Sequence, residues 1–220
     1  MKTRSLVMSI MVIAVVATTV RVDASQELKE RIIERLPVEK NEPIAITDIK
    51  VDGQGVSLDK KFRASDDWLQ SLVISIKNKS DKVILFASIR LQFPRPAGSS
   101  ERLSIFDMSQ GNAALPTRPP TAEERMVGFG PDETVEISLS PQQFAGLRDF
   151  LSATQYPYSI EKVDLSIGHV VFADDTMWYA GSQAQRDPKD LSRWINSRYA
   201  NPKPQQPCKP RLLRQKGQGS

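Results

Sequence analysis

The chain has 220 residues, among them 30 Lys and Arg, 26 Asp and Glu, one His and one Cys, which gives a formal net charge of +4. A single cysteine excludes an internal disulfide, and one histidine with one cysteine is too few ligands for a zinc site, so no cofactor is expected. The basic excess lies in the last twenty positions rather than on a folded face, which argues against a nucleic-acid partner.

Residues 1–24 have the three parts of a secretory signal peptide. Lys2 and Arg4 precede an uncharged apolar run from Leu6 to Val20, and Val22-Asp23-Ala24 provides a small-residue cleavage site. We expect cleavage after Ala24 and a secreted or periplasmic protein. The alternative is an uncleaved membrane anchor. However, the run of 15 residues spans only about 22 Å as a helix, less than the roughly 30 Å apolar core of a bilayer, so no stable membrane span is expected after cleavage.

Residues 25–40 predict a short N-terminal amphipathic helix followed by a linker. Apolar residues recur at helical spacing up to Pro37, at Leu28, Ile32, Ile33 and Leu36. A helix of about twelve residues is marginal in water. We expect it to pack on the following domain or to form a mobile leader to it.

Residues 41–181 predict a β-sandwich domain. Apolar and polar residues alternate, without a βαβ rhythm, in at least five segments, found at 44–51, 72–77, 83–93, 135–140, 163–172 and 177–179. A slip of phase at Thr47-Asp48 predicts a β-bulge. Segments 72–77 and 83–93, joined by the polar residues 78–81, predict a β-hairpin; Asn78-Lys79-Ser80 in this turn also matches a glycosylation sequon. The pattern predicts a mainly-β fold, an antiparallel, immunoglobulin-like β-sandwich.

Two helices are predicted late in the chain. Ser140 with Gln143 forms a capping box that opens a short crossover helix between the two sheets. Asp187-Pro188 opens a C-terminal helix within residues 182–200, with an apolar face of Leu191, Trp194 and Ile195. Tyr156 and Tyr158 precede the strand at 163 and are candidates for a tyrosine-corner contact.

Two segments lack regular patterning. The insertion at 94–132 is rich in Pro, Gly, Ser and Asn, with weak strand signals at 103–108 and 125–129, and long insertions of this kind are either functional or disordered. Residues 201–220 have too little apolar content to fold and predict a disordered, basic, Pro-rich tail. Cys208 in this tail is either a free thiol or one half of an intermolecular disulfide.

Few residues are candidates for catalysis or metal binding, and none is predicted to do either. His169 lies in a strand without a nucleophile motif nearby and is predicted to be structural. It points into the core if the phase of the strand continues, and outward if Gly168 marks a bulge. Asp66-Asp67 and Asp174-Asp175 lack the spacing of a calcium loop, and the second pair is predicted to be a hairpin turn.

Two groups of residues are candidates for interaction. Trp178, Tyr179 and Trp194 either form an interface or pin the C-terminal helix on the sheet. The basic residues of the tail either bind an acidic partner or are only solvated; they are Lys203, Lys209, Arg211, Arg214 and Lys216.

Two stretches resemble known secreted proteins. Residues 171–194, VFADDTMWYAGSQAQRDPKDLSRW, resemble the end of the immunoglobulin-like domain in a group of uncharacterised secreted bacterial proteins, although Asp175 replaces their usual turn glycine. Residues 78–93, NKSDKVILFASIRLQF, are similar to the paired strands of bacterial FxLYD-type sandwiches. The resemblance implies the fold and the compartment, and it transfers no functional residue.

The sequence therefore favours a non-catalytic, exported β-sandwich that acts as a binding or structural module of the bacterial envelope. Its expected contact surfaces are the insertion at 94–132 and the basic tail, and its expected partner is a protein or a cell-envelope polymer. One alternative is a small secreted hydrolase that uses carboxylates near the insertion. Another is an accessory subunit of an envelope complex, docked through its terminal helices.

Overall fold

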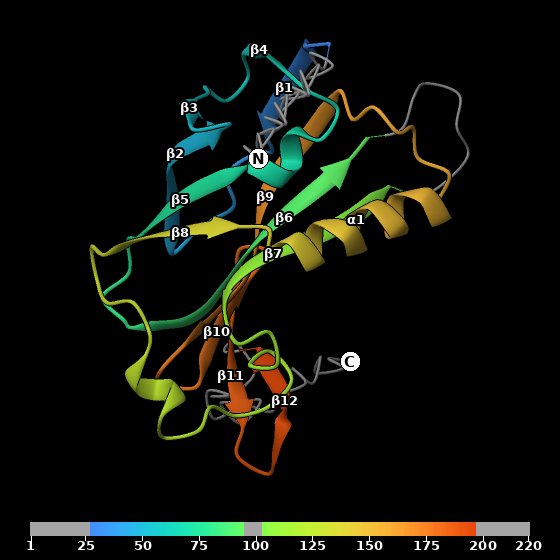
Figure 1. Cartoon of the computed structure of the whole chain (residues 1–220). Coiled ribbons are helices and arrows are strands. Elements are labelled where there is room, and N and C mark those ends of the chain that lie inside the picture. The colour runs from blue at the N-terminus through green and yellow to red at the C-terminus, as the bar shows by residue number, and fades with distance from the viewer. Residues whose placement is uncertain (1–26, 95–102, 197–220) are drawn as a thin grey trace, which may run out of the picture.

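The computed structural model describes residues 27–94 and 103–196. In this part of the chain two β-sheets share one core, and the helix α1 (Pro141–Ala153) lies beside them (Figure 1). The predicted mainly-β sandwich is confirmed. The predicted signal peptide at 1–24 and the tail at 201–220 lie outside the described residues.

The smaller sheet, sheet B, has four antiparallel strands in the order β3-β2-β5-β8. They are β2 (Ile44–Val51), β3 (Gln54–Gly55), β5 (Val73–Asn78) and β8 (Thr134–Ser138). The register of β2 on β5 shifts between Ile46 and Asp48, so the bulge predicted at Thr47-Asp48 is confirmed. The hydroxyl of Thr47 donates a hydrogen bond to the carbonyl of Ser75 at this point.

The larger sheet, sheet A, is built around the long strand β9 (Lys162–Phe172). One edge of β9 pairs with β6 (Ile84–Phe93), which in turn pairs with β7 (Ser104–Gly111). The other edge is shared: β1 (Lys29–Arg35) pairs in parallel with its first half, and β10 (Thr176–Tyr179) pairs antiparallel with its second half. The outer strands are β4 (Lys61–Ala64) beside β1, then β11 (Ser182–Asp187) and β12 (Asp190–Asn196) beyond β10.

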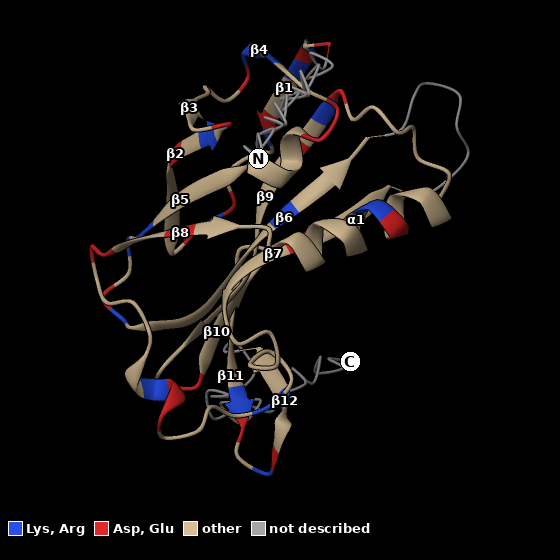
Figure 2. Ribbon diagram, viewed as in Figure 1, with Lys and Arg blue, Asp and Glu red and all other residues tan. Residues whose placement is uncertain are grey.

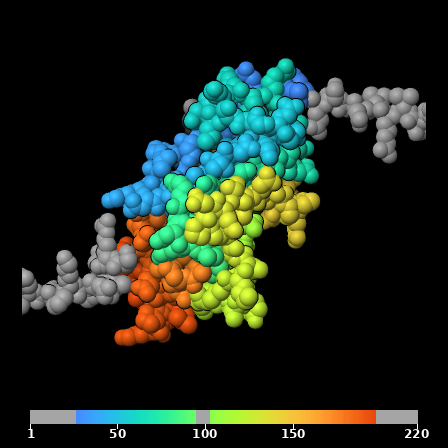
Figure 3. Space-filling model, turned by 90° about the vertical axis from the view of Figure 1, so that its left-hand side faces the viewer, coloured from blue at the N-terminus to red at the C-terminus, as the bar shows by residue number. Residues whose placement is uncertain are grey.

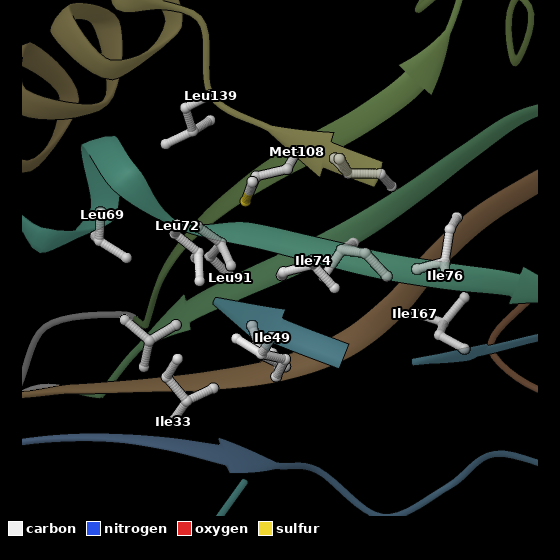
Figure 4. Packing of buried hydrophobic residues seen from close by; sticks show 14 of the residues in the cluster. Ile33, Ile49, Leu69, Leu72, Ile74, Ile76, Leu91, Met108, Leu139 and Ile167 are labelled. Atoms are coloured by element: carbon white, nitrogen blue, oxygen red, sulfur yellow. The ribbon is translucent and has the colours of Figure 1, made fainter. Parts of the chain in front are cut away.

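The core fills the space between the sheets (Figure 4). Ile33, Leu91 and Ile167 from sheet A meet Ile49, Ile74 and Ile76 from sheet B. Each such side chain stabilises the fold by roughly 1.5–3 kcal/mol when it is fully buried. Trp68, in the 3₁₀ turn η1 (Trp68–Ser71), is fully buried, and its indole nitrogen donates to the carbonyl of Ile160 at 2.9 Å.

The N-terminal element is the strand β1, so the predicted amphipathic helix is wrong. Ile33 and Arg31 take inward positions two residues apart, as in a strand, and both are buried. The guanidinium of Arg31 donates to Asp66 Oδ1 at 2.6 Å and to Ser159 Oγ at 2.9 Å. Because Arg31 is charged and yet points inward, the alternation of apolar and polar residues that is typical of a strand is not visible in this part of the sequence.

The predicted hairpin of 72–77 with 83–93 is also wrong, because β5 lies in sheet B and β6 lies in sheet A. Asn78 is fully buried where the chain passes between the sheets. Its amide nitrogen donates to the carbonyls of Lys82 at 2.8 Å and Phe129 at 3.3 Å, and its oxygen accepts from Ser80. The amide of the sequon is therefore inaccessible for modification in the folded protein.

The predicted C-terminal helix is replaced by the antiparallel hairpin of β11 and β12. The carboxylate of Asp187 accepts from the backbone nitrogen of Lys189, and that of Asp190 accepts from Ser192. In each case the acceptor binds the N–H two residues ahead, which closes a turn rather than starting a helix.

Two local predictions are confirmed. Ser140 and Gln143 form the capping box of α1, and α1 connects β8 in sheet B to β9 in sheet A. The turn at Asp174-Asp175 leads β9 into β10, with a positive φ of 58° at Asp175.

The N-terminal strands occupy one end of the molecule and the C-terminal hairpin the other (Figure 3). No helix within the described ranges is long and apolar enough to cross a membrane.

Candidate functional site

A groove of about 460 Å³ lies between α1, the loop that follows it and the start of η1. We call it the α1 groove. Its lining combines aromatic and apolar side chains with charged ones: Asp67, Phe144, Arg148, Asp149, Leu151, Ser152, Tyr156, Pro157 and Tyr158. Arg148 and Asp149 are the two charged residues of α1 (Figure 2). A concave, largely apolar lining with a few polar groups is typical of a binding site.

Arg148 is held on several sides in this groove. One terminal amino group donates to the carbonyl of Tyr158 at 2.7 Å and the other to Asp67 Oδ1 at 2.6 Å. The guanidinium carbon lies 4.0 Å from the ring centre of Tyr158 and 5.6 Å from that of Phe144, so the cation contacts two aromatic rings. The side chain is 18% exposed, and these contacts give it one fixed orientation.

Tyr158 is the exposed aromatic group of the groove, with 68% of the residue accessible. Its hydroxyl lies 3.4 Å from Asp67 Oδ1, the oxygen that also accepts from Arg148. Asp67 occupies the N-cap position of η1 but makes no side-chain capping bond there. Its carboxylate instead orients Arg148 and Tyr158.

The tyrosine-corner hypothesis gains no support from these contacts. The hydroxyl of Tyr156 donates to the carbonyl of Pro94 at 3.0 Å, 62 residues upstream, and its ring packs edge-on against Phe93. A tyrosine corner bonds the backbone only a few residues upstream. Tyr156 thus ties the end of α1 to the end of β6, and Tyr158 lines the groove.

Two of the aspartates considered for calcium, Asp66 and Asp174, are engaged with cations. Asp66 is paired with Lys29 and Arg31, and hydrogen bonds from Ser159 and Lys29 hold its pKa well below the usual range. Asp174 is paired with Lys82; burial raises the pKa of Asp174, but the bonds from Lys82 and Thr176 outweigh it and lower the pKa.

The two aspartate pairs considered for calcium are therefore parts of ion pairs. Asp67 bonds Arg148, and Asp175 accepts two hydrogen bonds from Arg125, at 2.9 and 3.1 Å. Within the described ranges no three His, Cys, Asp or Glu side chains gather closely enough to hold a metal ion.

The aromatic residues singled out in the sequence do not form one cluster. Trp178 is fully buried in the main core, with its indole nitrogen donating to the carbonyl of Lys40 at 3.2 Å. Tyr179 lies on the outer face of sheet A, 40% exposed. Trp194 stacks on the guanidinium of Arg186 at 4.1 Å and donates to the carbonyl of Pro116 at 2.7 Å.

These contacts tie part of the insertion to the C-terminal hairpin. The buried Arg186 donates to the carbonyls of Leu115 and Leu191, and burial lowers its pKa. Within the insertion, Arg118 makes a bidentate pair with Glu124 at 2.6 and 2.8 Å, which lowers the pKa of Glu124 to about 2. The predicted strand signal at 103–108 corresponds to β7.

The interaction residues proposed in the tail lie outside the described residues: Lys203, Lys209, Arg211, Arg214 and Lys216. Cys208 lies outside them as well.

The α1 groove was not predicted as a site. Its residues come from three segments, 67, 144–152 and 156–158, and no motif within any one of them indicates it.

Comparison with known proteins adds no assignment, because no protein-family model, curated protein or solved structure matches the chain.

Proposed function

We propose that the protein is a non-catalytic, exported, immunoglobulin-like β-sandwich that serves as a binding module of the bacterial envelope, with the α1 groove as its contact site. The observation that carries the proposal is Tyr158, a residue that is 68% exposed and whose ring is nevertheless fixed against Arg148, with the guanidinium carbon 4.0 Å from the ring centre. An aromatic ring that is already oriented loses little conformational entropy when a partner covers it.

A sugar-containing polymer of the envelope fits this groove. The C–H face of a sugar ring packs on the electron-rich face of an aromatic ring such as Tyr158. Asp67, Arg148 and Ser152 add a carboxylate, a guanidinium and a hydroxyl, which bind sugar hydroxyls as acceptor and donors. The predicted signal peptide at 1–24 supports export, and the two-sheet architecture with the resemblance at 171–194 supports the immunoglobulin-like class.

The carboxyl groups support a binding role over the hydrolase alternative. A general acid at neutral pH needs a carboxyl group whose pKa is raised. Among the described residues, every carboxyl group with a shifted pKa is shifted downward: Glu30, Asp66, Glu123, Glu124, Asp132, Asp174 and Asp190.

One observation favours the accessory-subunit alternative. Met126 and Val127, in and after the 3₁₀ turn η2 (Glu124–Met126), are 86% and 82% exposed, and adjacent apolar residues this exposed are typical of a protein contact. The terminal elements proposed for docking are strands rather than helices, so this pair is the better candidate for such a contact.

Sedimentation with purified cell-wall sacculi tests the three functions together. We expect the protein to co-sediment, and Tyr158→Ala to weaken binding about tenfold or more, as for a central contact residue. Met126→Ala is the control, because it removes an exposed side chain outside the groove. Undiminished binding by Tyr158→Ala would contradict the proposal, capture of an envelope protein lost only in Met126→Ala would favour the accessory subunit, and release of soluble fragments would show a hydrolase.

A further inference from the structure

The α1 groove carries one charge that its own residues do not compensate. One guanidinium and two carboxylates line it, those of Arg148, Asp67 and Asp149. Arg148 and Asp67 form an ion pair at 2.6 Å, so these two charges balance each other. Asp149 is exposed, and within the described ranges no group donates a hydrogen bond to its carboxylate or pairs with it.

The other cations near this end of the groove are already occupied. Arg31 donates to Asp66, to the hydroxyl of Ser159 and to the carbonyl of Ser65. Lys29 pairs with the second carboxylate oxygen of Asp66 at 3.0 Å. A counter-charge for the carboxylate of α1 is therefore not provided by the described part of the chain.

A ligand that covers the groove has to compensate this carboxylate. Taking a charge out of water is unfavourable unless an opposite charge or strong hydrogen bonds replace the water. Sugar hydroxyls supply hydrogen bonds but no charge, and Asp149 would repel an acidic ligand. A protonated amine supplies both, because an ammonium group carries a positive charge together with three N–H donors.

Asp149 also lies beside the groups that we assign to the sugar ring. Ser152 follows it three residues later, so the two side chains are neighbours on the surface of α1, and both line the groove. Arg148 covers one face of the Tyr158 ring, with the guanidinium carbon 4.0 Å from the ring centre, and the residue is still 68% exposed. An amino sugar carries its amine directly on the ring, so a single unit offers an apolar face to Tyr158 and a cation to Asp149.

We propose that Asp149 selects a free amino group, so that the α1 groove binds a polymer segment containing amino sugars that are not acetylated. This inference rests on the function proposed above and specifies the charge of its ligand. Acetylation converts the amine into a neutral amide, which leaves Asp149 covered without a counter-charge. The groove therefore discriminates between two forms of the same sugar unit.

Calorimetric titration of the purified protein with two oligosaccharides tests this selection. The hexamers of glucosamine and of N-acetylglucosamine differ only in the acetylation of the amine. In mildly acidic buffer, in which the sugar amine is protonated, we expect the glucosamine hexamer to bind about threefold to tenfold more tightly. This is the range for an ion pair that is strengthened by hydrogen bonds and remains partly open to water.

Variants at one exposed position locate the selection. Asp149→Asn should bring the ratio of the two affinities to about one, and Asp149→Lys should reverse the preference, because a second cation would then face the amine. Asp81→Asn is the matched control: Asp81 is also exposed and lies outside the groove, and no partner for its carboxylate is found in the described part of the chain. We expect this variant to keep the preference.

The outcomes separate this inference from the function on which it rests. Equal affinities for the two hexamers, both weakened in Tyr158→Ala, would overturn the inference and leave the proposed function intact, whereas no binding of either hexamer would count against both. A preference that falls equally in Asp149→Asn and Asp81→Asn would show attraction between the whole chain and a polycation, and would refute the selection. Hexalysine that binds as tightly as the glucosamine hexamer would refute the assignment to a sugar.

Discussion

Replacing Asn78 with alanine tests whether this residue holds the two sheets together. Its side chain is fully buried and takes part in four hydrogen bonds, two donated to the carbonyls of Lys82 and Phe129 and two accepted from Ser80. A net contribution of about 1 kcal/mol for each of the two buried donor bonds, and somewhat less for the bonds to the more accessible Ser80, sums to about 3 kcal/mol. For a domain of this size that corresponds to a fall in Tm of about 6–12 °C.

Urea unfolding followed by tryptophan fluorescence measures the change, because Trp68 and Trp178 are fully buried in the folded protein. Asn112→Ala is the matched control: Asn112 also makes two side-chain hydrogen bonds but is exposed, and its loss is expected to cost under about 1 kcal/mol. Asn78→Asp should destabilise the fold more than alanine does, since a carboxylate would face two carbonyl oxygens. A loss below about 1 kcal/mol for Asn78→Ala would refute this account of the connection.

Three further substitutions test other parts of the fold. Gly168→Ala places a Cβ 2.3 Å from Ser88 Oγ, and we expect a loss of about 1–3 kcal/mol in thermal unfolding, partly recovered when Ser88 is also changed to Ala. Asp66→Asn should lower the free energy of unfolding by about 1–3 kcal/mol at pH 7 by depriving the buried Arg31 of its counter-charge. Because the pKa of Asp66 is lowered in the folded state, its contribution is complete above the unfolded pKa near 4 and is lost as the pH falls further, so the two proteins should converge in unfolding experiments at low pH. Ser140→Ala removes the cap of α1 and should cost about 1 kcal/mol in urea unfolding.

The features predicted correctly from the sequence are those whose contacts are local. The capping box joins Ser140 to Gln143, three residues away, and the turn at Asp174-Asp175 closes within its own hairpin. The bulge at Thr47 disturbs an alternation that the neighbouring residues already show. In each case the residues that determine the geometry lie within a few positions of one another, so a single sequence contains the necessary information.

The N-terminal strand could not be predicted because its stability depends on distant partners. Arg31 occupies an inward position in β1, and Asp66 and Ser159 accept hydrogen bonds from its terminal amino groups from 35 and 128 residues away. Without these partners a buried arginine would be strongly unfavourable, and the helical interpretation avoids it by placing the residue on a polar face. Sequence spacing does not reveal that the partners exist.

The connection after β5 could not be predicted for a different reason. Polar residues such as Asn78 and Ser80 suit a hairpin turn, and they equally suit an arch that leads from one sheet to the other. What distinguishes the two is whether the asparagine amide reaches solvent or a carbonyl such as that of Phe129, 51 residues away. The same ambiguity applies to Asp187, because an aspartate that bonds a nearby N–H can close a turn or cap a helix.

The positions of the late aromatic residues and of His169 follow from strand geometry. Trp178 and Tyr179 are adjacent, and in a strand adjacent side chains point to opposite faces, so once β10 forms only one of them can reach solvent. His169 would have pointed inward with Ile167 but for one extra residue in β9, and that residue places it against Tyr179. Arg90, Asp107 and Tyr179 face outward from the regular phase of their own strands. The outward position of His169 therefore depends on one bulge, and a variant that restored the regular register would separate the histidine from Tyr179 while leaving the rest of sheet A paired.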